Sequence, residues 1–275
     1  MKKIVFTFVL VIGLVLCGSL QAALVNGDFE ADPFMTGWTD VEPTRPTTLH
    51  DGIAPGSTQA ARLTGTSEDG ISNDLLQAVA PLASEWIADF YFAVADQAEY
   101  TGTASSNRSM ALVLSNAPEG TKYDYAVNMK ITNSTEGQFN FFGDGWQPVG
   151  NGDEVTFSVD ENRDGDFSDA ADTLNVHHMR IVGHDWGTPD VNYDFWCSAA
   201  NSDELLPVAT GLTYFQFDAP NGTNPSELTT IAFQTTWGLC NGQPAVVDDV
   251  TFVPEPMTMC LLGLGGLAML RRRRV

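Results

Sequence analysis

Cysteine and basic side chains are both scarce in this chain of 275 residues. It has four cysteines, and 13 Lys and Arg residues against 35 Asp and Glu residues. Six of the basic residues and one acidic residue lie in two end segments, 1–23 and 254–275, so the body between them has seven basic residues, 34 acidic residues and a net charge of −27. Such a body repels nucleic acid phosphates and anionic membranes, and it attracts divalent cations. We therefore expect no nucleic-acid partner.

Catalytic motifs are also missing. The sequence contains no nucleophile elbow, no zinc-protease motif and no glycine-rich phosphate loop. Paired carboxylates for glycoside hydrolysis cannot be recognised in a sequence, because their spacing is set in three dimensions. We therefore expect a binding or structural protein and not an enzyme, with a polysaccharide lyase or hydrolase as the less favoured alternative.

The first 23 residues have the pattern of a secretory signal peptide. Two lysines precede an apolar run over 4–16, and the small side chains of Ala22 and Ala23 suit a signal peptidase. We expect signal peptidase to release a mature chain that begins near Leu24.

The last 22 residues form a second targeting segment. Pro254, Glu255 and Pro256 precede an apolar stretch over 257–270. As a helix, 14 residues rise only about 21 Å, which is short for a bilayer core of about 30 Å. Arginine side chains that reach the headgroups reduce this mismatch, and their charge holds that end in the cytoplasm. These side chains are Arg271, Arg272, Arg273 and Arg274.

The Pro-Glu-Pro triplet, the glycine-rich apolar stretch and the arginine cluster together resemble the PEP-CTERM sorting signal of bacteria. In that family the tail is a transmembrane helix that holds the protein in the inner membrane until a transpeptidase, exosortase, cleaves near the triplet and passes the body to the cell surface or extracellular matrix. The resemblance covers only 254–275 and implies exosortase as a partner. A plain membrane anchor, which does not need the triplet, is the alternative.

The body between the two segments, 24–253, has the pattern of a single all-β domain. Short β-forming runs alternate with clusters of Gly, Asn, Asp, Ser and Pro, which predicts an antiparallel β-sandwich, most simply a jelly roll. Helix is expected only at the two ends, with a short helical turn at 74–79. The expected strands cover 86–94, 110–115, 125–132, 154–159, 176–182, 212–217, 228–235 and 245–252.

The two margins of the body resemble jelly-roll carbohydrate-binding modules and their galactose-binding-like relatives. The residues concerned are 26–30 with Gly37-Trp38, and 246–252. The middle of the body suits a concanavalin-like sandwich equally well. The resemblance implies that the first and last strands lie close together and share a structural calcium ion, bound by Glu30 and Asp249. Asp248 would then point to the opposite face.

One acidic loop has the spacing of a calcium site. Calcium prefers six to eight hard oxygen ligands on a flexible loop, and here acidic or amide side chains occupy alternate positions before and after a glycine at position 6. Position 12, where an EF-hand has glutamate, is alanine, so a nearby aspartate would take its place. The expected ligands are Asp160, Asn162, Asp164 and Asp166, with Asp169 or Asp172.

Aromatic side chains in turns are the candidate glycan contacts. Trp146 and Trp186 lie in glycine-rich turns, where an indole ring can reach solvent and stack on a sugar. The alternative is that each ring closes one end of the core, and both interpretations also apply to Trp196, Trp237 and Tyr193.

Cysteine and histidine complete the set of candidates. Cys197 and Cys240, the two cysteines of the body, form either one disulfide in the oxidising compartment or two buried thiols. His178 and His184 would share one face of a strand about 20 Å apart, too far for one zinc ion, with His177 on the opposite face. We expect these histidines at the surface or on an edge strand.

Overall fold

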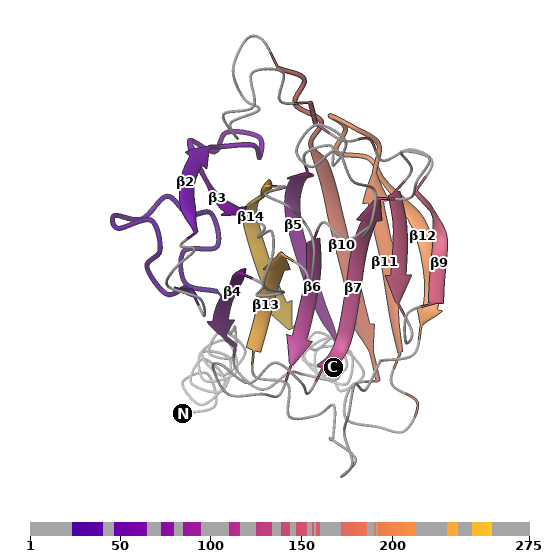
Figure 1. Ribbon diagram of the computed structural model, residues 1–275. Coiled ribbons are helices and arrows are strands. Elements are labelled where there is room, and N and C mark those ends of the chain that lie inside the picture. Colours follow the sequence, from indigo (N-terminus) through magenta and orange to yellow (C-terminus); the bar gives the residue numbers. More distant parts are fainter. Residues whose placement is uncertain are drawn as a thin grey trace, which may run out of the picture.

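The computed structural model describes fifteen stretches of the chain, and within them the chain forms fourteen β-strands. The stretches are 24–40, 47–64, 73–79, 85–94, 110–115, 125–133, 139–143, 147–152, 156, 158–159, 172–185, 190, 192–212, 230–235 and 244–254. The strands make two antiparallel sheets of seven strands each, which face one another as the two layers of a sandwich (Figure 1).

The first sheet runs in the order β1-β4-β13-β6-β7-β8-β9. Its strands are β1 (Thr39–Asp40), β4 (Asn73–Ala78), β13 (Thr230–Thr235), β6 (Met110–Ser115), β7 (Tyr125–Asn133), β8 (Phe139–Gly143) and β9 (Gln147–Gly152).

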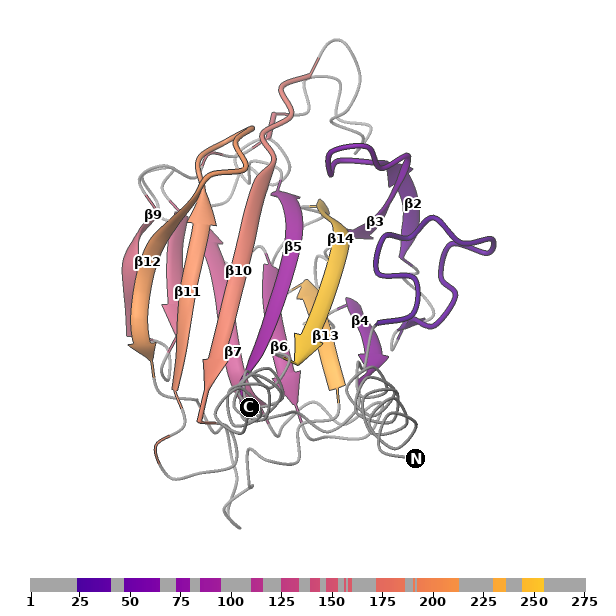
Figure 2. The ribbon, with the colours of Figure 1, turned by 180° about the vertical axis from the view of Figure 1, so that it is seen from behind.

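The second sheet runs in the order β12-β11-β10-β5-β14-β3-β2 and is the nearer layer in Figure 2. Its strands are β12 (Leu205–Leu212), β11 (Asn192–Ser198), β10 (His177–His184), β5 (Trp86–Val94), β14 (Pro244–Pro254), β3 (Gln59–Thr64) and β2 (Thr48–Asp51).

The chain crosses repeatedly between the two layers. β5, β10–β12 and β14 belong to the second sheet, whereas β4, β6–β9 and β13 belong to the first. Hairpins that wrap around a shared core in this way are the hallmark of jelly-roll sandwiches. The predicted all-β antiparallel sandwich is therefore confirmed. The signal peptide and the apolar tail lie outside the described residues.

Several predicted strands have the expected bounds and others do not. β5 and β6 begin and end as predicted, β13 begins two residues later than predicted and ends as predicted, and β10 and β14 differ by one or two residues at each end. The helical turn expected at 74–79 is wrong, because this segment forms β4 between β1 and β13. Of the strand expected at 154–159, the described residues form only a bridge between Val159 and Thr173.

Aromatic side chains from both sheets fill the core. Along β5, residues alternate between buried and partly exposed, so that Trp86, Phe90 and Phe92 point inward. Phe233 of β13 meets Phe90 edge to face, with ring centroids 5.1 Å apart and planes at 74°. Burial of each such ring contributes about 1.5–3 kcal/mol to folding, so these contacts hold the two layers together.

The segment that precedes β1 packs against the last strand, but not as a strand. Residues 26–30, expected to be extended, form a turn in which Asn26 and Phe29 have φ of 54° and 57°. The Val250 N–H donates to the Gly27 carbonyl over 2.7 Å. A Cβ at position 27 would lie 1.9 Å from the Val250 carbonyl oxygen, so this contact requires glycine.

A buried carboxylate connects β14 to the loop after β2. Asp248 is fully buried, and one of its oxygens accepts hydrogen bonds from the Ile53 and Ala54 N–H groups over 2.9 and 2.8 Å. Its other oxygen accepts from the Asp249 N–H over 2.7 Å. Asp248 therefore satisfies three backbone donors at once.

Replacing Asp248 by alanine removes the acceptor for these three donors. Buried donors without a partner cost about 1–3 kcal/mol each, so Asp248→Ala should lower the free energy of unfolding in urea by at least about 2 kcal/mol. Asp51→Ala, an exposed site on β2, is the control and should change it by less than about 0.5 kcal/mol. Equal stability of the two variants would contradict this role of Asp248.

Candidate functional site

The outer face of the second sheet carries polar and aromatic side chains on its two central strands. β10 pairs with β5 in antiparallel register, with Arg180 opposite Asp89 and His178 opposite Tyr91. Both strands alternate between buried and partly exposed residues. Since successive residues of a strand point to opposite faces, Asp89, Tyr91, His178 and Arg180 all lie on the outer face.

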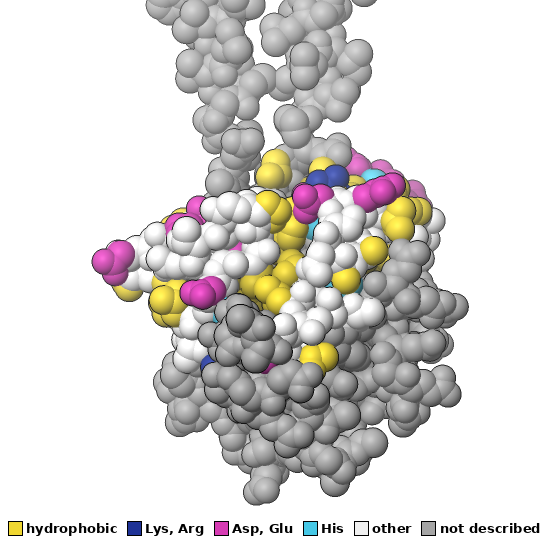
Figure 3. All heavy atoms as spheres, turned by 90° about the horizontal axis from the view of Figure 1, so that it is seen from above, with side chains coloured by type: hydrophobic (Ala, Val, Ile, Leu, Met, Phe, Trp, Pro, Cys, Tyr) yellow, Lys and Arg dark blue, Asp and Glu magenta, His cyan; other side chains and the backbone are white. Residues whose placement is uncertain are grey.

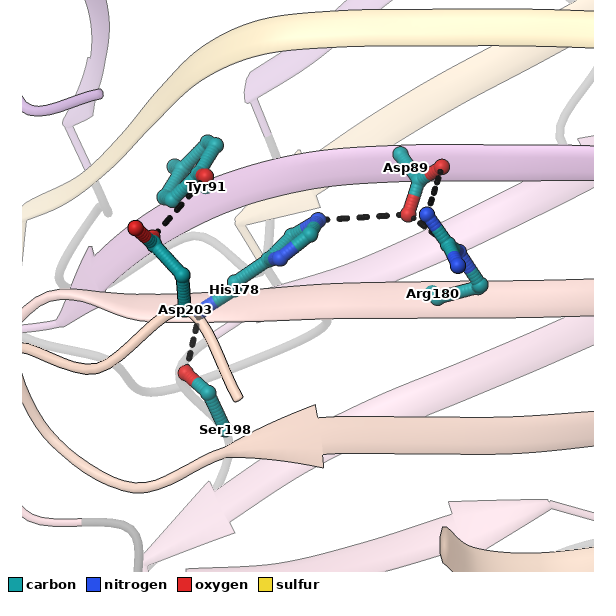
Figure 4. A network of polar contacts seen from close by, with 6 residues as sticks. All are labelled: Asp89, Tyr91, His178, Arg180, Ser198 and Asp203. Atoms are coloured by element: carbon teal, nitrogen blue, oxygen red, sulfur yellow. Dashed lines mark hydrogen bonds and ion pairs between the residues drawn. The ribbon is translucent and has the colours of Figure 1, made fainter. Parts of the chain in front are cut away.

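Asp89 is the centre of a hydrogen-bonded group on this face (Figure 4). The Arg180 guanidinium donates to both oxygens of Asp89, with Nε 2.8 Å from one and Nη2 2.9 Å from the other. His178 Nε2 lies 3.2 Å from the same carboxylate. Burial alone would raise the pKa of Asp89, but the hydrogen bonds from His178 and Arg180 outweigh burial and lower it. The carboxylate therefore stays ionised and its two partners stay in place.

Tyr91 and His178 form a stacked pair beside this carboxylate. Their ring centroids are 4.6 Å apart and their planes differ by 11°. The Tyr91 hydroxyl donates to Asp203 over 3.1 Å, and the Ser198 hydroxyl oxygen accepts from the His178 backbone N–H over 2.8 Å. Burial, together with Asp203, raises the pKa of Tyr91 to about 12. Tyr91 is therefore a hydrogen-bond donor at any ordinary pH.

We call the six residues of Figure 4 the outer-face cluster; they are Asp89, Tyr91, His178, Arg180, Ser198 and Asp203. Trp196 lies next to them, because it is the cross-strand partner of Arg180 on β11. Its side chain is partly exposed, whereas its neighbours Phe195 and Cys197 are buried. An indole ring, a fixed ion pair and a stacked Tyr–His pair thus lie together on one face.

A bulge in β14 places a further carboxylate near the cluster. The register between β14 and β5 shifts between Asp248 and Thr251, and Asp249 has a φ of 45°. Burial raises the pKa of Asp249, as do the charges of Asp28 and Asp89, while His178 opposes them. Asp249 is exposed, so it contributes negative charge at the margin of the cluster.

Glu30, expected to share a calcium ion with Asp249, binds the loop before β3. Its carboxylate accepts hydrogen bonds from the backbone N–H groups of Thr58 and Gln59 and from the hydroxyls of Ser57 and Thr58. The hydrogen bonds from Thr58 are the main reason that the pKa of Glu30 falls to about 2. Among the residues that the structure describes, no three His, Cys, Asp or Glu side chains are grouped so that they could hold a metal ion.

The other two histidines of β10 occupy different environments. His184 lies between Glu85 and Asp194, 2.8 and 3.2 Å from their carboxylate oxygens. His177 is buried on the inner face of β10, and β10 is an interior strand of its sheet. The expectation of a surface or edge-strand position is therefore wrong for His177. The prediction that His177 and His178 point to opposite faces is confirmed.

Most other residues predicted to bind ligands or to be processed lie outside the described part of the chain. Asp172 is described and adjoins the Val159–Thr173 bridge, Cys197 is buried in β11, and Pro254 is the last residue of β14. The residues outside the description are Asp160, Asn162, Asp164, Asp166, Asp169, Trp146, Trp186, Cys240, Glu255, Pro256, Arg271, Arg272, Arg273 and Arg274.

The family model of the PEP-CTERM protein-sorting motif matches residues 252–274, which confirms the resemblance of the tail. The chain is thus an exported protein that exosortase recognises, that is anchored in the membrane before processing and that then reaches the cell surface. Within the described residues there is no helix with the length and apolar character needed to cross a membrane. No curated protein matches the chain in sequence.

Solved structures with a similar fold include three carbohydrate-related proteins. The PL-14 alginate lyase from Aplysia kurodai is 9% identical with a TM-score of 0.48, and the match covers 85% of this chain and 98% of that one. Lectin I-B4 from Griffonia simplicifolia is 11% identical with a TM-score of 0.45, over 85% and 98% of the two chains. The carbohydrate-binding module CBM66 from Bacillus subtilis is 13% identical with a TM-score of 0.37, over 79% and 95%.

The two contrasting histidines predict opposite dependences of stability on pH. Partial burial opposes protonation of His184, but its hydrogen bonds with Glu85 and Asp194 outweigh burial and raise its pKa above 6.5. The stability that it contributes is present below pH 6.5 and is lost as the pH rises through the higher folded value. Burial lowers the pKa of His177 below 6.5, so its contribution is lost as the pH falls.

His184→Gln should therefore reduce the free energy of unfolding more at pH 6 than at pH 9, by less than about 1 kcal/mol because the ion pairs are partly solvated. His177→Gln should weaken the loss of stability that the wild-type protein shows below pH 6.5. Urea unfolding between pH 5 and 9 measures the difference in free energy of unfolding between each variant and the wild-type protein. This difference should change with pH in opposite directions for the two variants, and a change in the same direction would contradict the assignment.

Proposed function

We propose that this protein is a glycan-binding, structural component of the bacterial cell surface or extracellular matrix, and that the outer-face cluster with Trp196 is its binding face. The single observation that carries the proposal is the fixed ion pair of Asp89 and Arg180 in one cross-strand row with Trp196 and beside the Tyr91–His178 stack. Exosortase sorting supports it, because the processed protein reaches the surface where such polymers lie.

The chemistry of the cluster suits sugar rings. Carboxylate and guanidinium groups form paired hydrogen bonds with vicinal hydroxyls, and a partly exposed indole ring offers an apolar surface to the C–H face of a pyranose. Hydrogen bonds within the protein already fix Arg180, His178 and Tyr91. A ligand would therefore bind without ordering these side chains, which lowers the entropic cost of binding.

The net charge points to the class of glycan. The body carries a charge of −27, and on the face shown in Figure 3 acidic side chains appear at more points than basic ones. A polyanion such as a uronic acid polymer is repelled by this field. We therefore favour a neutral polysaccharide.

Binding is favoured over catalysis because the polar groups of the cluster are already bonded to one another. Asp89 is hydrogen-bonded to Arg180 and His178, and the Tyr91 hydroxyl donates to Asp203. To attack a sugar or transfer a proton, either group would first have to break these contacts. A lyase or hydrolase remains the second candidate function, and release of reducing ends or unsaturated sugars would reveal it.

Affinity electrophoresis on gels that contain neutral or uronate polysaccharides tests the binding face. Trp196→Ala and Arg180→Ala should each weaken retardation on a neutral polysaccharide by about tenfold in affinity or more, since a buried stacking or charged contact contributes about 1.5–3 kcal/mol. Val182→Ala, on the same face of β10, is the matched control and should leave retardation unchanged.

Two outcomes would contradict this assignment. Loss of retardation in Trp146→Ala or Trp186→Ala, with Trp196→Ala unaffected, would place glycan binding in the turns. Absence of retardation on every gel would leave the protein with a structural role alone.

We also propose that calcium stabilises the body through the loop 160–172. The N–H and carbonyl groups of Val159 and Thr173 form two hydrogen bonds, of 2.8 and 2.9 Å, so the ends of the loop are held together. Asp172 is directly beside this bridge. A loop closed at its neck needs less ordering to collect oxygen ligands around one ion, which supports the loop as a site.

Calcium removal should lower the melting temperature. A ligand present at about 100 times its Kd stabilises a protein by about 2.7 kcal/mol, so a chelator should shift the melting transition down by several degrees and excess calcium should restore it. Asp164→Asn should abolish the response, whereas Asp190→Asn, an exposed residue outside the loop, should retain it. An unchanged melting curve in the wild-type protein would remove the calcium assignment.

A further inference from the structure

The last strand of the sandwich runs into the sorting motif without a linker. β14 ends at Pro254, and the sorting motif match begins at Phe252. The residues from Phe252 to Pro254 thus belong both to the folded body and to the motif. In Figure 2, β14 lies beside β5 along its whole length and ends at the same end of the sheet at which β5 begins.

These shared residues are firmly held. Phe252, Val253 and Pro254 are in register with Ala88, Ile87 and Trp86 of β5. Phe252 is 1% exposed and stacks on the fully buried Trp86, with ring centroids 5.6 Å apart and planes at 25°.

The Trp86 indole is packed tightly against the backbone of β10. A Cβ on Gly183 of β10 would lie 2.0 Å from the Trp86 ring, so the indole occupies the space that only glycine leaves open. The end of β14 is therefore fixed through Trp86 to a third strand. To extract Phe252 from the body, its contact with Trp86 and its pairing with β5 must both break.

The distance to the membrane segment is short. Three residue steps separate Pro254 from Met257, where the apolar stretch begins, and three extended residues span at most about 10 Å. A membrane enzyme that acts on this junction therefore meets the folded end of the second sheet, formed by β14, β5 and β10.

We propose that the folded body itself sets where and how fast exosortase cuts: the pairing of β14 with β5 restricts cleavage to the C-terminal side of Pro254, and local opening of the strand end limits its rate. This inference rests on the sorting function of the tail. Cleavage breaks one peptide bond after Pro254. The acyl group passes to an amine acceptor or to water, and the proton that the acceptor loses ends on the new amino group of the released tail.

The position of the cut is measured by mass spectrometry of the processed full-length protein from cells that contain exosortase. The mature chain should retain Pro254 at or near its C-terminus. A C-terminus at Val253 or earlier would overturn the inference, because the enzyme would then have taken residues out of the paired strand.

The rate of the cut is measured by pulse-chase labelling of the full chain in the same cells. Six Gly and Ser residues inserted between Val253 and Pro254 should speed conversion of the anchored form by at least about threefold, as should Phe252→Leu, because cleavage of a locally closed segment follows the population of its open form. Phe233→Leu, a buried aromatic of β13 whose ring packs against Trp38 and Phe90, is the matched control and should convert at the wild-type rate.

Equal rates for all four chains would overturn the inference but leave sorting intact. Equal acceleration by Phe252→Leu and Phe233→Leu would also overturn it, since global stability and not the strand end would then set the rate. A chain that is never shortened, whether exosortase is present or absent, would overturn the sorting assignment and this inference together.

Discussion

The pairing of β5 with β14 is the interaction on which the rest of the structure depends. β5 lies at the centre of the second sheet, with β10 on one side and β14 on the other. Its inward side chains, Trp86, Phe90 and Phe92, supply much of the core, and its outward Asp89 and Tyr91 supply two members of the outer-face cluster. Because the two sets alternate along one strand, a one-residue slip against β14 would exchange core and surface.

The bulge in β14 changes which of its residues point into the core. Strict alternation would place Val247, Asp249 and Thr251 on one face, yet the core contains Val247, Val250 and Phe252. Asp249, with its positive φ, is the extra residue that resets the alternation. Asp248, which precedes this shift, is buried beneath the loop at 53–54, and Asp249 is exposed near the cluster. Bulges of this kind are common next to functional sites.

The sequence allowed prediction of local features but not of the site. The β-forming runs at 86–94 and 176–182 identified two strands, and the acidic body and the C-terminal sorting segment could be recognised from residue order alone. β4 was missed because Asn73–Ala78 has no β-branched residue to mark a strand. Asp89 is 89 and 91 positions from His178 and Arg180 in the sequence, and Tyr91 is 112 positions from Asp203. The pairing of β5 with β10, and of β10 with β11, brings these residues together. The sequence shows Asp89 and Tyr91 at alternate positions of one predicted strand and His178 and Arg180 at alternate positions of another, but it does not show that these two strands pair.

The position of β14 explains in physical terms why the sorting motif follows this strand directly. β14 is the last strand along the sequence, yet it inserts between β5 and β3 in the interior of its sheet. Its pairing with β3 and β5 joins residues more than 150 positions apart, and such distant contacts form slowly. Until β14 is in place, the aromatic side chains of β5 have an open flank and the second sheet is in two pieces. A tail that holds the chain at the membrane immediately after Pro254 therefore keeps an incompletely folded, aggregation-prone sheet in one place until its final strand has closed it.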